Sequence, residues 1–404
     1  MRIFFLCFFL GTLVWFFHQT PDAAANPTVY IGFLLVFPSV LARVLATLRM
    51  PPSLGAFIAA IFLSFSGLIP RAVLEPLLPY SSLAIIWVGL HLGLSCSTIQ
   101  IRNPRLLLAA GLVVLASLLT TFSILLVFDL PLDLTLQISC LAGFSAPLFF
   151  LLNEKKTAEA YPLSLLTSLF SFSLLALVHL VEGRIQEVFP NPFQRWDYLI
   201  FMVAIELVVL SFRQIRTRPG RYILLGLTTC LILLAAWIRN FSPFTLSLMT
   251  GFALSLRFHT QRGDIQITQV LAAFLVPFVL ADFVLRLEPV GLLSLTSGHW
   301  QFLVLYTLAM AGGKFVGTLL TTRVTGIPLQ NQLPLLQQGL IAGVMFDFTL
   351  STSMFTPFLQ APGHALTVGM MVLTGGCLPI FSLVLQWGIK KIKTGYIRAS
   401  ARTT

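Results

Sequence analysis

Long apolar segments alternate with short polar connections along almost the whole chain. Thirteen such segments lie at approximately 28–42, 52–69, 79–97, 105–128, 132–152, 161–181, 198–212, 221–238, 243–256, 266–285, 300–321, 333–356 and 364–389. A helix needs about 20 apolar residues to cross a hydrocarbon layer of about 30 Å. Barrel strands would alternate polar and apolar residues, whereas a stretch such as 106–128 is apolar on every face. The pattern predicts an all-α polytopic membrane protein with about 13 transmembrane helices.

The chain begins with a shorter apolar segment of a different kind. Residues 3–17 follow Arg2 and precede the small residues Ala23, Ala24 and Ala25. A basic start, a short apolar run and small residues are typical of a signal peptide. Residues 1–25 are therefore either a signal peptide or an extra N-terminal helix.

Only 10% of the 404 residues are charged, and the formal net charge is +11. Most of the 25 basic residues fall in alternate connections, whereas the opposite connections contain only Arg71, Arg184, Arg195, Arg239 and Arg286. Those in the alternate connections are Arg43, Arg49, Arg102, Arg105, Lys155, Lys156, Arg213, Arg216, Arg218, Arg221, Arg257, Arg262 and Arg323, followed by the basic tail. Lys and Arg in short connections stay on the cytoplasmic side. We therefore predict a multi-pass protein of the plasma (inner) membrane with a cytoplasmic C-terminus. This distribution excludes nucleic acid as a partner, because phosphate binding needs clustered basic residues.

The seventh apolar segment separates two sets of six. An odd segment between the sets inverts the second one, as in the inverted repeats of many secondary transporters. We predict a first six-helix repeat at 28–181, a linker helix and loops at 182–219, a second six-helix repeat at 220–389 and a basic cytoplasmic tail at 390–404.

Two segments contain breaks at matching positions of the two sets. The fifth contains Ala142, Gly143 and Pro147, and the twelfth contains Gly339 and Gly343. Broken helices are tolerated inside a membrane where they contact protein or a watery cavity, and paired breaks indicate a midplane binding site. The alternative is that the glycines and the proline only ease helix packing.

Lys314 lies near the middle of the segment at 300–321, beside Gly313. An ionisable residue at this depth costs roughly 2.5–3.5 kcal/mol on insertion scales and usually faces a partner in the protein interior. Asp347, one segment later, is its candidate counter-ion. A purely structural salt bridge is the alternative to a transport role. Asp282 has its own candidate partner in Arg286, four residues along the same predicted helix.

Features of an enzyme or of a cofactor site are not apparent in the sequence. The five cysteines are scattered through apolar segments without CxxC spacing, so we interpret them as small buried hydrophobic residues. We find no Ser/His arrangement and no metal-ligand spacing. The sequence predicts a membrane transporter, not an enzyme, and no cofactor.

Four motifs resemble one family in order and spacing. They are 49–55 (RMPPSLG), 89–94 (GLHLGL), 143–147 (GFSAP) and 313–317 (GKFVG). The chain thereby resembles the monovalent cation:proton antiporters of the potassium-efflux and sodium/proton exchanger type. The resemblance implies crossed broken helices in a core domain, a dimerisation domain, a homodimer, elevator-type alternating access, and Na⁺ or K⁺ and protons as partners.

One position departs from that family. The family's cation-binding carboxylate lies on the sixth helix, in a stretch that here contains Ser171, Phe172 and Ser173 and no acidic residue. Three functions remain open. The first is a divergent secondary transporter of this fold whose proton coupling uses another carboxylate such as Asp347 or is absent. The others are a carrier of an organic solute or anion with Lys314 as charge match, and a non-transporting scaffold or regulator. The candidate ion-binding residues are Lys314, Asp347, Ser145, Ser171, Ser173 and Phe172.

Overall fold

The computed structural model describes residues 27–47, 52–69, 71–95, 103–145, 160–181, 203–204, 207–208, 210–211, 218–239, 243–257, 262–287, 289–336, 342 and 363–377. Within these residues the regular structure is helical throughout, as the apolar segments predict. Four of the described helices are long and apolar enough to cross a membrane: Leu78–Ser95, Pro104–Phe128, Thr268–Arg286 and Ser297–Thr325. Seven shorter helices in the described part of the chain are also apolar. The all-α polytopic membrane fold is thereby confirmed.

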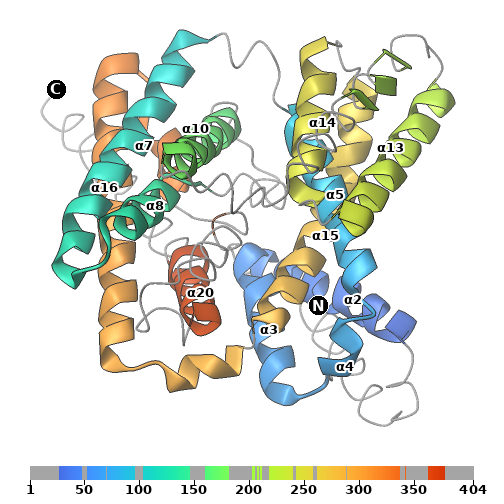
Figure 1. Cartoon of the computed structure of the whole chain (residues 1–404), viewed down its shortest axis with the longest axis horizontal. Coiled ribbons are helices and arrows are strands. Elements are labelled where there is room, and N and C mark those ends of the chain that lie inside the picture. Colours follow the sequence, from blue (N-terminus) through green and yellow to red (C-terminus); the bar gives the residue numbers. More distant parts are fainter. Residues whose placement is uncertain are drawn as a thin grey trace, which may run out of the picture. The chain divides into compact units, whose positions relative to one another are not determined.

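The chain divides into two compact units, each built from both halves of the sequence (Figure 1). Unit 1 comprises residues 1–103, 151–154 and 176–290, and unit 2 comprises 104–150, 155–175 and 291–404. Unit 1 therefore takes the first three segments of each predicted repeat, and unit 2 takes the fourth to sixth. If the two predicted repeats have the same order of helices and each is divided after its third helix, the two units are composed in this way.

The described helices of unit 1 come from residues 27–95 and 218–286. They are α2 (Pro27–Thr47), α3 (Pro52–Ser66), α4 (Arg71–Leu74), α5 (Leu78–Ser95), α13 (Arg218–Arg239), α14 (Pro243–Arg257) and α15 (Arg262–Arg286). Glycines bring α5 and α14 into backbone contact, since a Cβ on Gly93 would lie 2.4 Å from the Leu248 carbonyl oxygen and one on Gly251 would lie 2.5 Å from that of Leu90. Small residues of this kind are typical of close helix packing in membranes.

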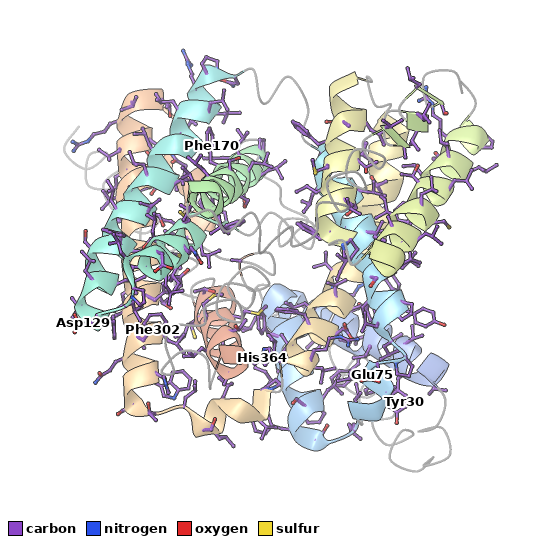
Figure 2. All side chains as sticks on the ribbon, viewed as in Figure 1. Tyr30, Glu75, Asp129, Phe170, Phe302 and His364 are labelled. Atoms are coloured by element: carbon purple, nitrogen blue, oxygen red, sulfur yellow. The ribbon has the colours of Figure 1, made fainter. Side chains whose placement is uncertain are left out.

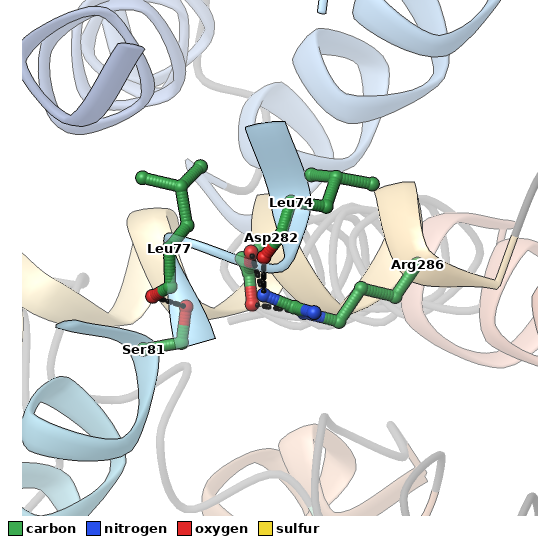
Figure 3. A network of polar contacts seen from close by, with 5 residues as sticks. All are labelled: Leu74, Leu77, Ser81, Asp282 and Arg286. Atoms are coloured by element: carbon green, nitrogen blue, oxygen red, sulfur yellow. Dashed lines mark hydrogen bonds and ion pairs between the residues drawn. The ribbon is translucent and has the colours of Figure 1, made fainter. Parts of the chain in front are cut away.

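An ion pair on α15 fixes the short helix α4 (Figure 3). The Arg286 guanidinium donates hydrogen bonds of 2.8 Å and 3.1 Å to the two Asp282 carboxylate oxygens. A third bond of 2.7 Å runs from Arg286 to the Leu74 carbonyl, at the end of α4. The pairing predicted from the four-residue spacing is therefore confirmed, and the structure adds a tie to a segment 212 residues away.

The described helices of unit 2 surround the break in the fifth segment. They are α7 (Pro104–Leu125), α8 (Leu132–Ala142), α10 (Ala160–Val181, which unit 2 holds as far as Leu175), α16 (Ser297–Thr325), α17 (Leu329–Gln332) and α20 (Gly363–Met371). Unit 2 also contains short 3₁₀ segments at Leu126–Phe128 and Leu333–Leu336 and a π-helical turn at Val372–Cys377. A further 3₁₀ segment, Pro289–Ser294, begins in unit 1 and continues into unit 2.

Helices α7 and α16 pack closely along their length (Figure 1). A Cβ on Gly313 would lie 2.7 Å from the Ser117 Cα, and one on Gly317 would lie 2.7 Å from the Val113 Cα. At the end of α7, Asp129 adopts a left-handed conformation with φ of 49° and begins the turn into α8 (Figure 2). Lys314 lies between Gly313 and Gly317 and therefore belongs to the part of α16 that packs closely against α7.

Large apolar side chains cover the outer faces of these helices. On α7 and α16 the exposed ones are Leu108, Leu115, Leu119, Val304, Leu305, Leu308, Val316, Leu319, Leu320 and Val324. A water-soluble monomer rarely exposes so continuous an apolar surface. This surface fits a hydrocarbon surrounding and agrees with the predicted membrane location.

Candidate functional site: the interrupted helix of unit 2

Helix α8 ends at Ala142, inside the predicted break. The next two backbone N–H groups make shorter-range bonds, from Gly143 to the Cys140 carbonyl at 3.3 Å and from Phe144 to the Leu141 carbonyl at 3.1 Å. The last carbonyls of a helix have no partner within the helix, and in a membrane interior each needs another donor. The break therefore requires polar side chains from neighbouring helices.

Helices α7 and α16 supply two of these donors. The Ser117 hydroxyl of α7 donates to the Ala142 carbonyl at 2.9 Å. The Lys314 ammonium of α16 donates to the Phe144 carbonyl. Both donors come from the close α7–α16 contact, so the glycines of that contact hold the two side chains at the end of α8.

Helix α10 supplies the third side chain. The Ser168 hydroxyl accepts a hydrogen bond of 3.2 Å from the Ser145 N–H. Its own proton is within reach of two carbonyls, that of Ser145 at 3.2 Å and that of Ser164 in the same helix at 3.0 Å. The Ser145 hydroxyl donates to the Leu335 carbonyl at 3.2 Å. Residues 142–145 are thus held by side chains from three helices.

Lys314 is completely buried. An ammonium carries three N–H donors, and within the described residues only the Phe144 carbonyl accepts from Lys314, with no carboxylate paired to it. Its predicted counter-ion, Asp347, lies outside the described residues, as do Gly339 and Gly343 of the second predicted break. The pairing of Lys314 with Asp347 stays a prediction.

The remaining candidates divide by their position on α10. Ser171 is completely buried, and its hydroxyl oxygen would lie 2.1 Å from a Cβ on Gly143, so only glycine fits there. Ser173 is exposed and donates to the Leu169 carbonyl of its own helix at 2.9 Å, so the structure does not bring it to the break. Phe172 lies between them on α10, and its side chain is outside the described part.

A comparison with solved structures identifies this arrangement of helices. The sodium proton antiporter MjNhaP1 from Methanocaldococcus jannaschii is similar over 89% of this chain and 95% of that chain, with a TM-score of 0.61 and 13% sequence identity. The chain has the fold of a sodium proton antiporter. No protein-family model matches the sequence, and no curated protein matches it.

Two residues that hold the break in this antiporter fold were not predicted from the sequence. Ser117 and Ser168 resemble the many other hydroxyl side chains of apolar helices, which usually bond to their own helix. A signal existed on α10, because Ser164, Ser168 and Ser171 are spaced by four and three residues and so share one helix face. That face is the one that contacts the interrupted helix.

Proposed function

We propose that the protein is a secondary transporter that exchanges a monovalent cation for protons at the interrupted helix α8. The observation that carries this proposal is the buried Lys314 ammonium on the carbonyl end of a broken helix, in a chain with the fold of an antiporter. Buried ionisable groups and broken helices mark ion pathways in membrane proteins.

The exchange step that we propose uses Lys314 as the proton-carrying group. The carbonyl end of a helix is the negative end of its dipole, and carbonyl and hydroxyl oxygens are the ligands that hard cations prefer. While Lys314 holds its proton, its ammonium occupies the Phe144 carbonyl. Loss of that proton removes one positive charge and frees the carbonyl for one Na⁺ or K⁺. The charge of the site is then the same in both states.

The other predicted site residues fit into this scheme at different points. Ser145 and Ser171 supply hydroxyls at the break, and Asp347 would be the carboxylate that answers Lys314. In the proposed elevator motion unit 2 is the moving body, since the described parts of the break all lie within it. We also expect a homodimer in the inner membrane with the C-terminus in the cytoplasm.

A carrier of small anions is the second candidate. Two of the three Lys314 N–H donors have no acceptor among the described residues, and Ser171 has a buried hydroxyl without a partner in the same part of the chain. Donors of this kind suit a carboxylate or an inorganic anion.

Everted membrane vesicles distinguish the two candidates. Vesicles that contain the protein are acidified by respiration and then receive Na⁺, K⁺ or an anion with an impermeant counter-ion. Collapse of the pH gradient by Na⁺ or K⁺, relative to vesicles without the protein, is the result that cation exchange predicts. A response to the anion alone would favour the second candidate. If neither the cations nor the anion changed the pH gradient, the remaining candidate function would be that of a non-transporting scaffold or regulator.

A further inference from the structure

Buried side-chain oxygens without a hydrogen-bond partner occur in the described part of the chain at Thr121, Ser164, Ser171 and Gln332. All four belong to unit 2. Unit 1 also buries many polar side chains, among them Ser247, Thr250 and Thr268, but contributes none to this group in its described residues. An unpaired buried polar group is destabilising, and a native protein retains one where it has a functional role, where strain is stored, or where water or an ion binds.

Three of these residues lie one turn away from the side chains that hold the break. Thr121 follows Ser117 by four residues on α7. Ser164 precedes Ser168 by four residues on α10, and Ser171 follows it by three. Residues spaced by three or four share a helix face. The unpaired hydroxyls therefore continue, in both directions, the face that contacts the end of α8.

Thr121 and Ser164 lie near opposite ends of their helices. Thr121 is four residues before the end of α7, and Ser164 is four residues after the start of α10, each about 6 Å along the axis from that end. Both helices follow a basic connection and so are predicted to start on the cytoplasmic side. Ser164 is then on the cytoplasmic side of the break and Thr121 on the external side.

We infer that Ser164, Ser171 and Thr121 line a hydrated path for a small ion in unit 2, in which Ser164 is reached from the cytoplasm in one state of the transport cycle and Thr121 from outside in the other. The path passes the break at Ser171, which contacts Gly143, the residue next to the Lys314 acceptor Phe144. Hydroxyl groups serve either sign of ion, because each can donate or accept. Access from both sides of the membrane rests on the proposed transport function. The inference does not depend on whether the transported ion is positive or negative.

Cysteine accessibility tests the path without measuring transport. Ser164→Cys, Ser171→Cys and Thr121→Cys are made in a background whose five native cysteines are replaced by alanine and that melts as the wild type does. A membrane-impermeant methanethiosulfonate is applied to everted and to right-side-out vesicles. The matched controls are Leu163→Cys on α10 and Val113→Cys on α7, whose side chains are completely buried.

We expect Ser164→Cys to react at least tenfold faster than Leu163→Cys in everted vesicles. Thr121→Cys should exceed Val113→Cys by the same factor in right-side-out vesicles, and Ser171→Cys should react from at least one side. Reaction of the three at the rates of the controls would overturn the path. Labelling without any ion flux would instead contradict the proposed function and leave the path standing.

A second measurement keeps the inference testable if the cysteine background does not fold. Ser164→Ala and Thr121→Val remove the unpaired oxygen from the otherwise native protein. In a dry interior this removal raises the Tm, because an unsatisfied group disappears. Along a hydrated path the oxygen is bonded to water, so we expect no rise. A higher Tm in both variants would overturn the inference.

Discussion

The Lys314 side chain of α16 donates a hydrogen bond to the Phe144 carbonyl, 170 residues earlier in the chain, at the end of the interrupted helix α8. The bond places a completely buried ammonium at the one point of α8 where the backbone lacks its helical donors. Both the stability of the break and the proposed exchange depend on this relationship.

Replacing Lys314 by alanine should destabilise the protein. The substitution removes a buried four-carbon side chain and the donor to Phe144, and large-to-small changes in a packed interior cost about 2–5 kcal/mol. Thermal unfolding in detergent measures the effect. Thr318→Val is the control, because Thr318 is equally buried on α16 but donates to the Phe315 carbonyl of its own helix. A Lys314→Ala melting curve like that of the wild type would refute the prediction.

Ser168→Ala should loosen the break from the α10 side. The hydroxyl accepts a hydrogen bond from the Ser145 N–H, so its loss leaves this buried group unpaired and costs about 1–3 kcal/mol. We expect a lower Tm and a lower rate of transport. Ser173→Ala, on an exposed part of the same helix, should change neither, and equal effects of the two variants would contradict the model of the break.

Gly313→Ala should separate α16 from α7, whereas the neighbouring Gly312→Ala should be tolerated. An added Cβ at Gly313 would lie 2.7 Å from the Ser117 Cα, while at Gly312 nothing lies within 4 Å. Overpacking of this kind costs about 1–3 kcal/mol, and here it would also shift Ser117 away from Ala142. Comparison of the two melting temperatures is the test. A Tm for Gly313→Ala as high as that for Gly312→Ala would show that the helices do not meet there.

Arg286→Gln should destabilise unit 1. The change removes the tie to the Leu74 carbonyl and leaves the buried Asp282 carboxylate with no guanidinium to accept from. The expected loss is about 1–3 kcal/mol. The double variant Asp282→Asn/Arg286→Gln should regain part of it, because the unpaired charge is then absent. Arg323→Gln, at an exposed position, is the control. If Arg323→Gln lowered the stability as much as Arg286→Gln does, the stabilising role of the Arg286 contacts would be refuted.

Phe172→Asp should create or strengthen cation-dependent proton flux. Phe172 lies in the α10 stretch where the antiporter family that the sequence resembles has its carboxylate, and proton and cation compete at such a group. Phe170→Asp, two residues away and labelled in Figure 2, is the control. The test is the cation-dependent proton flux in vesicles that contain the two variants at matched expression. A folded Phe172→Asp protein without added flux would speak against a lost exchanger site.

The sequence predicted those features that depend on local pattern. The break after Ala142 follows from the glycine and proline of residues 143–147, and the Asp282–Arg286 pair from helical spacing. The burial of Lys314 follows from its depth in an apolar segment. Each of these is a property of one segment, which hydrophobicity and backbone preference largely determine.

The contacts of Lys314 and Ser168 could not be predicted in the same way. The sequence predicts Asp347 as the counter-ion of Lys314 because it lies one segment later, and this pairing stays a prediction. The acceptor that the described residues show, a backbone carbonyl, was not predicted. A carbonyl has no sequence signature, since every residue carries one. Ser168 contacts the break because α10 packs beside it, and the choice of neighbouring helix is set by tertiary packing.

Ion flux in proteoliposomes that contain a pH-sensitive dye tests the central claim most directly. The wild type, Lys314→Met and Thr318→Val are reconstituted at equal amounts, and Na⁺ or K⁺ is added outside. We predict cation-dependent proton movement for the wild type and Thr318→Val, and its loss in folded Lys314→Met, whose unbranched side chain is one atom shorter and carries no titratable proton. Undiminished cation-dependent flux through Lys314→Met would contradict the account.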